Sequence, residues 1–271
     1  MRFTISSTAL SSRLLSLSRV INSKNTLPIL ECFLFEVHDG QLTITASDSE
    51  NVMQTTLNLE GSEGEGTFAV NNHTILDAVK ELPEQPLNVD VNLGEFKIYI
   101  TYQNGSYNFP ILNAEEYPKT QPIASDATSI TIGSGILADN ITRSIFATAQ
   151  DELRPVMNGI FFDLTTDWLA IVATDGHKLV RNKNFAIKND VPASFILPKK
   201  PANLLKGTLA KDESDVVIRF DSRSAEISYT DGSLTCRLIE GKYPNYNSVI
   251  PEDNPNQITI DRKSLIGAIR R

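Results

Sequence analysis

The stretch PVMNGIFFDLTTDWLAIVATDGH, residues 155–177, holds two apolar runs on either side of the polar tripeptide TTD. It aligns without a gap on PILECFLFEVHDGQLTITASDSE, residues 28–50, at an offset of 127 positions from Pro28 to Pro155. Two short apolar runs joined by a turn are typical of paired β-strands, and His38-Asp39-Gly40 is a hairpin signal between them. The alignment therefore predicts a strand–turn–strand unit that the chain uses twice.

The repeat extends outward from this stretch in both directions. FTI at 3–5 recurs as ITI at 130–132 and again as ITI at 258–260. Further matches pair Leu10 with Leu137, TFAV (67–70) with SFIL (194–197), and YQNGS (102–106) with YTDGS (229–233). Such repeats indicate one structural unit used several times. We expect two complete modules at 1–122 and 128–252 and the start of a third at 256–271, which would make the chain a shortened form of a three-module protein.

Each module is expected to combine two amphipathic helices with several strands. The first helix shows an apolar stripe at helical spacing, made of Leu10, Leu14, Leu17 and Ile21 in the first module and Leu137, Ile141 and Ile145 in the second. Residues 73–83 predict a second helix that ends at Pro83. Asn104-Gly105 and Asp231-Gly232 predict tight turns between strands. Since strands outnumber helices, we expect an α+β fold with helices on one face of antiparallel sheets.

The composition excludes several classes of protein. No run approaches the roughly 20 apolar residues of a membrane span, and the first residues lack a signal-peptide core, so we expect a soluble cytoplasmic protein. Cys32 and Cys236 lie in apolar strand-like runs and are expected to be buried reduced thiols. Three histidines without a C-x-x-C motif argue against a zinc site, and no cofactor is predicted. The net charge of −8 argues against nucleic-acid binding by bulk electrostatics.

Asp175, Gly176 and His177 are the part of the opening stretch that looks most like an active site. An enzymatic interpretation makes His177 a general base oriented by Asp175, as in a hydrolase. No nucleophile motif such as G-x-S-x-G stands beside it, and Asp48-Ser49 occupies the equivalent turn of the first copy without a histidine. The pattern favours a shared structural turn that is modified in one copy.

The repeat and four of its segments together resemble the bacterial DNA polymerase III beta sliding clamp family. The segments are TLPIL (26–30), MNGIFFD (157–163), ATDGHKL (173–179) and YPNYNSVIP (243–251). The resemblance implies repeated DNA-clamp modules, two three-module protomers joined head to tail in a ring around double-stranded DNA, and no catalytic activity. It implies a processivity factor whose partners are the replicative DNA polymerase, the clamp loader and other proteins with a clamp-binding motif.

Two consequences of this resemblance stay open at the level of sequence. Most of the third module is missing, so we expect the chain not to form the usual homodimer ring. The alternative function is a protein-interaction scaffold that does not encircle DNA. Binding of DNA that weakens with salt would separate a clamp from such a scaffold.

The resemblance also implies a partner-peptide pocket near the junction of the second and third modules. Carried over position by position, the pocket includes Met157, Thr174, Gly176, His177, Lys178, Leu179, Pro244 and Val249. Apolar side chains of such a pocket anchor a short linear motif, and a few polar groups fix its register. Met157 stands where the better-known members carry leucine, and an adaptable methionine is expected to preserve the pocket.

Six positions are implied as DNA contacts, and they are Lys24, His73, Gln150, Lys199, Lys200 and Lys206. A ring that its topology holds on DNA needs only weak, exchangeable phosphate contacts in order to slide. The negative net charge is therefore compatible with DNA in the ring. His73 contributes a charge only when it is protonated.

Overall fold

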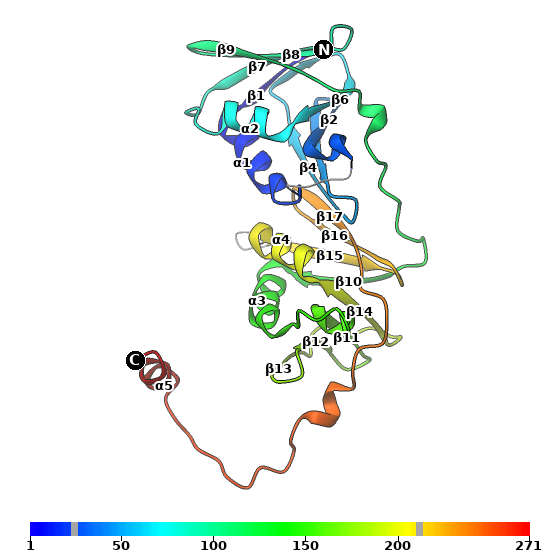
Figure 1. The fold of residues 1–271 in the computed structure, drawn as a ribbon, viewed down its shortest axis with the longest axis vertical. Coiled ribbons are helices and arrows are strands. Elements are labelled where there is room, and N and C mark those ends of the chain that lie inside the picture. Colours follow the sequence, from blue (N-terminus) through cyan, green and yellow to red (C-terminus); the bar gives the residue numbers. More distant parts are fainter. Residues whose placement is uncertain (23–26, 210–213) are drawn as a thin grey trace. The chain divides into compact units, whose positions relative to one another are not determined.

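The computed structural model describes residues 1–22, 27–209 and 214–271 (Figure 1). The described residues fall into two units, Met1–Gly241 and Lys242–Arg271. The first unit holds residues 1–241, which include all of the first expected module and most of the second, and the second unit holds the helix α5 (Arg262–Ile269). None of the helices in these described ranges has the length and apolarity needed to cross a membrane.

The described residues of the first module contain nine strands and two helices. The strands are β1 (Arg2–Ser6), β2 (Cys32–His38), β3 (Gln41–Ser47), β4 (Asn51–Asn58), β5 (Gly61–Glu63), β6 (Gly66–Asn71), β7 (Pro86–Asn92), β8 (Lys97–Tyr102) and β9 (Gly105–Pro110). The helices are α1 (Ser7–Ser18) and α2 (Asn72–Val79). The order strand, helix, strands, helix, strands agrees with the pattern read from the sequence.

The second module repeats this order, and its described residues include no counterpart of the short strand β5. Its strands are β10 (Thr128–Gly133), β11 (Gly159–Leu164), β12 (Leu169–Thr174), β13 (Leu179–Asn184), β14 (Ala193–Pro198), β15 (Asp215–Phe220), β16 (Ser224–Tyr229) and β17 (Gly232–Arg237). Its helices are α3 (Ser134–Ser144) and α4 (Lys199–Leu209). The described part of the chain therefore has the predicted α+β fold of repeated modules.

The strands form three antiparallel sheets. Five strands of the first module form the sheet β5-β1-β7-β8-β9, and four strands of the second form β13-β12-β11-β14. The remaining sheet has eight strands in the order β10-β15-β16-β17-β4-β3-β2-β6. It takes four strands from each module, and β17 pairs with β4 at the boundary. The sequence did not predict that one sheet would run through both modules.

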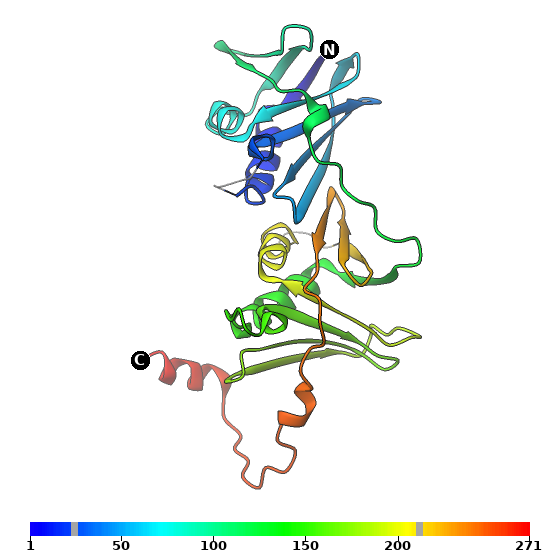
Figure 2. The same cartoon turned by 45° about the vertical axis from the view of Figure 1, so that its right-hand side comes forward.

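In the described ranges of the first unit, four α-helices cover the sheets. Helix α1 packs against α2, and α3 packs against α4. In both views these helices lie on the same side of the sheets (Figures 1 and 2). This arrangement agrees with the expectation that helices cover one face.

The apolar stripe of α1 is confirmed except at its last residue. Ser6 is the N-cap of the helix, and its Oγ accepts a hydrogen bond from the backbone N–H of Ala9 at 3.1 Å. Leu10, Leu14 and Leu17 are fully buried. The helix ends at Ser18, so Ile21 lies beyond it, and Ile145 likewise follows α3 as its C-cap. The predicted stripe therefore runs three residues past the end of α1 and one residue past the end of α3.

Helix α2 also ends earlier than predicted. It stops at Val79, and the N–H of Leu82 bonds the carbonyl of Val79 at 3.2 Å in a separate turn. A residue before proline is disfavoured in helical conformation, so Pro83 restricts Leu82 and the chain leaves the helix before it. The prediction that the helix extends to Pro83 was wrong.

The hairpin turns are partly as predicted. Asp39 and Gly40 both have positive φ, +48° and +71°, and join β2 to β3 as a two-residue loop of the expected kind. Asn104-Gly105 and Asp231-Gly232 are not the central residues of their turns. Tyr102 pairs with Gly105 and Tyr229 pairs with Gly232, so each glycine begins a strand. The turn prediction was therefore displaced by one residue in both modules.

Gly232 is a glycine because another strand passes very close to it. A Cβ at this position would lie 2.0 Å from the backbone oxygen of Gln54 on β4. No side chain fits at that distance. The glycine that looked like a turn residue is instead the contact point between the two modules.

Equivalent aromatic pairs fill the two module interiors. Phe35 stacks on Phe68 at 5.2 Å between ring centroids, and Phe162 stacks on Phe195 at 4.5 Å. Each pair links two neighbouring strands, β2 with β6 in the first module and β11 with β14 in the second. Offset stacking of the rings adds to the energy of burial. The repeat therefore extends to core packing.

Cys32 and Cys236 are free and buried, as predicted. Burial raises the pKa of the Cys32 thiol to about 11 and that of Cys236 to about 12. Both thiols therefore stay protonated and unreactive near neutral pH.

Candidate functional site

The turn between β12 and β13 is built around the carboxylate of Asp175. Its Oδ1 accepts the backbone N–H groups of His177 and Lys178, each at 2.9 Å, and its Oδ2 pairs with the Lys178 ammonium. These bonds hold the pKa of Asp175 well below its ordinary value, with the Lys178 side chain as the largest cause. Gly176 has φ +91°, which favours glycine. The aspartate therefore shapes the turn.

The equivalent turn of the first module has the same construction. Asp48 Oδ1 accepts the backbone N–H groups of Glu50 and Asn51 at 3.0 and 2.7 Å, and Ser49 has φ +80°. The Asp48 Oδ2 binds Lys200 of the second module at 2.5 Å. The predicted shared structural turn is confirmed, and in the first module it is also a docking point for the next module.

This geometry does not support a hydrolytic role for Asp175 and His177. Both oxygens of Asp175 are engaged by backbone N–H groups and by Lys178, and the described bonds to His177 come from its main chain. The His177 side chain is exposed. A general base needs its carboxylate partner on the imidazole, and that arrangement is not among the described contacts.

An open depression of about 530 Å³ lies beside this turn. It brings together His177, Lys199 and Gln150, which belong to both groups of predicted site residues. Its other lining residues are Ile145, Phe146, Thr148, Ala149, Asp151, Arg154 and Asp175. The lining of the depression therefore includes two cationic side chains, Arg154 and Lys199, and two carboxylates.

Three further residues of the predicted pocket, Met157, Thr174 and Leu179, lie at or beside the turn. Met157 is buried, and its Cε would lie 3.9 Å from a Cβ on Gly176. Thr174 is also buried, and its Oγ1 donates to the carbonyl of Lys178 at 2.8 Å. Leu179 opens strand β13 and is half-buried. Met157 and Thr174 thus lie at the turn itself, and Leu179 follows it at the start of β13.

Pro244 and Val249 belong to the second unit. Pro244 is exposed, and Val249 ends a short 3-10 turn with 67% of its surface exposed. Their part in a joint pocket remains a prediction.

The predicted DNA contacts have different surroundings. Gln150 is exposed, His73 is exposed in the first turn of α2, and Lys206 is half-buried in the last turn of α4. Lys199 donates to the carbonyl of Ala149 at 2.6 Å, and desolvation lowers its pKa, with the Lys178 charge as the second cause. Lys24 lies outside the described residues.

Lys200 joins the two modules. Its Nζ donates to the carbonyl of Val20 and to Oδ1 of Asn22, each at 2.6 Å, and to Asp48 Oδ2 at 2.5 Å. Three acceptors satisfy an ammonium group completely. DNA contact by Lys200 stays a prediction, but its ammonium is already engaged within the chain.

Sequence reasoning missed a second contact between the modules. A Cβ on Gly207 of α4 would lie 2.6 Å from Nη1 of Arg19, which follows α1. The guanidinium therefore lies against the bare backbone of α4. A glycine inside a helical segment costs roughly 1 kcal/mol relative to alanine, and that cost was the available signal for a close approach.

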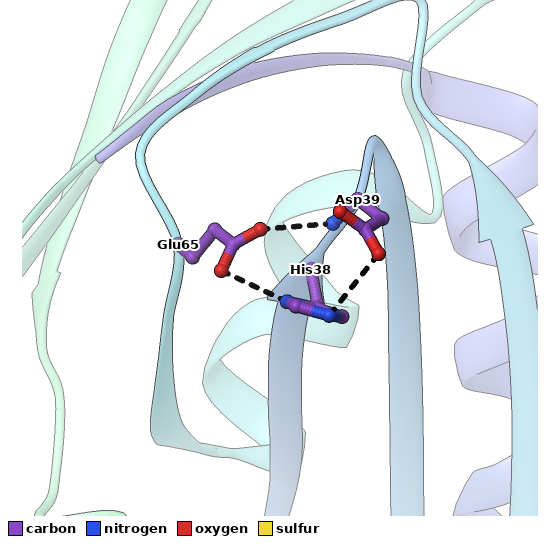
Figure 3. Close-up of side chains that lie close together, drawn as sticks. All are labelled: His38, Asp39 and Glu65. Carbon is purple, nitrogen blue, oxygen red and sulfur yellow. Dashed lines mark hydrogen bonds and ion pairs between the residues drawn. The ribbon is translucent and has the colours of Figure 1, made fainter.

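One cluster of potential metal ligands occurs in the described part of the chain, at the β2–β3 hairpin. His38, Asp39 and Glu65 are all exposed. Figure 3 shows the imidazole between the two carboxylates, with Nδ1 at 2.8 Å from Glu65 and Nε2 at 3.2 Å from Asp39. Two carboxylates on opposite ring nitrogens fit a protonated histidine that donates twice. The cluster is better explained as an ion triad than as a metal site.

Replacing Glu65 by glutamine is expected to lower the pKa of His38. The bond from Glu65 is the largest cause of its raised pKa, followed by the charge of Asp39. A raised pKa means that the triad stabilises the fold fully below the ordinary value of 6.5 and loses this effect as pH rises through the folded value. NMR titration of His38, with His73 as internal reference, measures the change. An unchanged His38 midpoint would show that Glu65 does not hold the imidazolium.

Comparisons with known proteins agree with this architecture. The family model described as DNA polymerase III beta subunit, N-terminal domain, matches residues 1–121, and the central-domain model matches residues 131–245. A beta sliding clamp from Buchnera aphidicola is 28% identical over 271 residues, which is 100% of this chain and 74% of that protein. One from Pseudomonas aeruginosa is 27% identical over 272 residues, with the same coverage.

Solved structures give the same result. The sliding clamp of Pseudomonas aeruginosa bound to griselimycin has a TM-score of 0.93 and 27% identity, over 100% of this chain and 73% of that one. The DNA polymerase sliding clamp of Bacillus subtilis has a TM-score of 0.91 and 25% identity, with the same coverage.

Proposed function

Because the chain belongs to the family of DNA polymerase III beta subunits, the beta sliding clamps, we propose that it acts as a processivity factor that holds a replicative polymerase on double-stranded DNA. The family is one of non-enzymatic proteins, which agrees with the structural role of Asp175. The observation that carries the proposal is the pair of repeated modules joined through one continuous sheet, over which both family models match.

The partner-peptide pocket is proposed around the β12–β13 turn. Its members in the first unit are Met157, Thr174, Gly176, His177, Lys178 and Leu179, and those in the second are Pro244 and Val249. Half-buried Leu179 supplies apolar surface, buried Met157 lies next to Gly176, and the backbone fixed by Asp175 presents the polar groups. A relative bound to griselimycin shows that a member of this family takes a ligand.

The DNA-facing surface is proposed on the side where the four helices lie (Figure 2). Gln150, Lys199, Lys206 and His73 are its candidates, together with Lys24. Lys200 is the weakest candidate, since three acceptors already hold its ammonium. Weak phosphate contacts are sufficient for a ring that is held on DNA by its topology.

Domain limits and location follow as further parts of the proposal. We propose clamp domains at 1–122 and 128–252, with a third domain starting at 256–271. We also propose a cytoplasmic protein, as expected for a factor that works on replicating DNA. In the family's arrangement, which we propose for this protein, protomers of three such domains form a homodimer ring that binds the clamp loader and other proteins with a clamp-binding motif.

Leu179→Ala is expected to weaken binding of a peptide with a polymerase-type clamp-binding motif by about tenfold, and His177→Ala by a smaller factor. The Leu179→Ala change removes apolar surface that would anchor the peptide, whereas the His177→Ala change removes a polar contact. Fluorescence anisotropy with a labelled peptide measures both. Phe185→Ala is the matched control, because Phe185 is exposed and lies just beyond the far end of β13. Equal affinities for all four proteins would contradict the pocket.

A scaffold without DNA contact remains the second candidate function. The observation that favours it is that Lys199 and Lys200 both donate to acceptors within the chain.

DNA binding by the original chain and by the Lys206→Gln variant distinguishes a clamp function from a scaffold function. If Lys206 contacts a phosphate, the variant should weaken DNA binding and reduce the slope of log affinity against log salt by about one. Fluorescence polarisation with duplex DNA at several salt concentrations gives the slope. Lys188→Gln, in the exposed loop after β13, is the control. DNA binding that is absent at low salt would support the scaffold.

A further inference from the structure

The first strands of the two modules differ in their neighbours. Strand β1 is paired on both sides, with β7 and with the short strand β5. Strand β10 holds the same place in the second module, and among the described residues it pairs with β15 alone and ends the eight-stranded sheet. The side of β10 that corresponds to the β5 side of β1 is therefore an open sheet edge.

The first module shows which backbone groups this edge offers. The N–H of Glu60 bonds the carbonyl of Thr4 at 3.1 Å, so the main-chain groups of Thr4 point toward β5. Thr131 corresponds to Thr4 at the offset of 127, and the main-chain groups of alternate residues in a strand point to the same side. Ser129 and Thr131 should therefore present their N–H and carbonyl groups to the open side of β10.

Strand β10 carries none of the features that usually protect a sheet edge. Edge strands of native sheets are commonly shielded by lysine, by proline or by a β-bulge. Residues 128–133 read TSITIG and pair with β15 at six consecutive positions, so this strand has no charged residue, no proline and no bulge. The side chains of Ser129 and Thr131 are small and exposed. The strand itself therefore offers no obstacle to an added extended segment.

Strand β5 shows what kind of segment this position takes in the first module. Its pairing with β1 places Glu63 opposite Arg2 and Gly61 opposite Thr4. Arg2 also bonds Asp90 of β7 at 3.0 Å, so a cation lies between two acidic residues. Residues 60–65 read EGSEGE, with three glutamates and two glycines. The segment that occupies the edge of β1 is therefore short, acidic and rich in small residues.

In the second module the cation lies one strand further from the edge. Ser129 takes the place of Arg2, and its partner on β15 is Arg219. The described contacts of the Arg219 guanidinium are long, 3.6 Å to the carboxylate of Glu226 and 3.4 Å to the carbonyl of Ala124. Both exceed the usual length of an N–H···O hydrogen bond. Arginine has five N–H donors, so Arg219 can also bind an acid placed across the small side chain of Ser129.

A depression of about 470 Å³ lies where β10 begins. Its lining includes Thr128 of β10, Ser194 of β14 and the exposed Arg223 in the turn after β15. An antiparallel segment on β10 would pass Thr131 and then Ser129 before it reaches this depression. The end of the segment would therefore lie beside a second arginine.

Two carboxylates also line the depression. Asp221 accepts the backbone N–H groups of Arg223 and Ser224 at 2.7 and 2.8 Å, so its charge is used within the turn. Asp126 is exposed and opposes an acidic ligand. A hollow of about 660 Å³ lies beside β5 in the first module as well. The features that distinguish the second module are therefore the open edge and the position of Arg219, not the volume.

We propose that the open edge of β10 is a second peptide-binding site, which takes an extended acidic segment of a partner protein by strand addition. The expected register repeats that of β5, with an acidic residue opposite Ser129 and a small residue opposite Thr131. Main-chain hydrogen bonds supply affinity in this mode of recognition, and Arg219 and Arg223 select an acidic segment. The site goes beyond the proposed function, because it shares no residue with the pocket at the β12–β13 turn and does not need DNA.

Chemical-shift mapping with the full 271-residue chain tests the site. The probe is a capped peptide, LNLEGSEGEG, which copies residues 57–66 and so carries the β5 segment. Ordering a short flexible peptide costs free energy, so the titration extends to millimolar peptide. The amide signals of Ser129 and Thr131 should move, and those of Ile130 and Ile132, which face β15, should move less. Shifts confined to the β12–β13 turn, or no shift along β10, would overturn the proposal.

A proline variant tests the main-chain hydrogen bonds. Thr131→Pro removes one outward N–H, and proline is tolerated on an edge strand where the N–H faces solvent. The variant should bind the peptide about tenfold more weakly. Thr131→Ala keeps the N–H and should bind like the original chain, and urea denaturation checks that both variants fold. A folded Thr131→Pro variant that binds as tightly as the original chain would overturn strand addition.

A double-mutant cycle tests the pairing of the acidic residue with Arg219. Arg219→Gln in the chain and Glu63→Gln in the peptide should each weaken binding about threefold, and the two together should weaken it hardly more than one alone. Arg143→Gln is the control for loss of a charge, because Arg143 is exposed on α3 and lies outside the edge. Effects of the two changes that simply multiply would overturn the register, and an equal effect of Arg143→Gln would assign the weakening to net charge.

Discussion

Replacing Gly232 by alanine is expected to lower the free energy of unfolding by about 3 kcal/mol, at the upper end of overpacking costs. A Cβ at Gly232 would lie 2.0 Å from the oxygen and 3.0 Å from the carbonyl carbon of Gln54. Both atoms belong to the backbone of β4, so neither can rotate away. The strands β17 and β4 must separate, and the bonds that join the modules are lost with them. Chemical denaturation followed by circular dichroism measures the change.

Gly105→Ala is the matched control for this variant. Gly105 occupies the same position in the first module, but a Cβ there would meet only the side chain of Tyr102, at 2.8 Å from its hydroxyl oxygen. A tyrosine side chain can rotate, so the expected loss is below about 1 kcal/mol. Both variants should be measured at a concentration where the chain is monomeric. Similar decreases in the free energy of unfolding for the two variants would show that the close approach of β4 to Gly232 does not determine the effect of the substitution.

The sequence predicts what depends on apolar patterning and on the repeat. The strands around Phe35 and Phe162, the buried face of α1 and the equivalence of the two modules all follow from residues close in sequence or from the offset of 127. The helix ends were less accurate, because the last turn of a helix depends on neighbouring elements. Ile21 continues the apolar stripe in sequence, yet the chain leaves the helix at Ser18.

The contacts between modules could not be predicted in this way. Gly232 follows an aspartate and looks like the second residue of a hairpin turn, a local signal that concealed its contact with Gln54. Lys200 stands beside Lys199 at the start of a helix, which suggested one shared role for both. Only the folded chain brings Asp48 to Lys200, from 152 positions away. Long-range pairs of this kind leave no periodic signal in one sequence.

The candidate site shows the same division. The shared turn at Asp48 and Asp175 was predicted from the alignment of the two copies, and its Oδ1 bonds are the same in both. What differs is the cation at Oδ2, which is Lys200 in the first module and Lys178 in the second. The turn at Asp48 thus binds a lysine of the other module, whereas the turn at Asp175 binds a lysine of the same turn.

Lys200→Met is expected to lower the free energy of unfolding by about 2–3 kcal/mol at neutral pH, below the full cost of breaking a buried pair because the lysine is partly exposed. The variant keeps the apolar stem but leaves Asp48, whose side chain is 4% exposed, without its cation. It also removes the donor to the carbonyl of Val20. Lys206→Met, further along the same helix, removes an equal charge and should cost little.

The pH dependence of the Lys200→Met variant distinguishes loss of the ion pair from loss of packing. Burial alone would raise the pKa of Asp48, but the bonds from Lys200 and Asn51 outweigh it and hold the pKa below its ordinary value of 3.8. A lowered pKa means that the pair stabilises the fold above that value and loses its effect as pH falls through the folded pKa. The stability gap between the original chain and the variant should therefore narrow in acid. Urea denaturation at several pH values measures it, and a gap that stays constant down to the acid limit of folding would assign the loss to packing instead of charge.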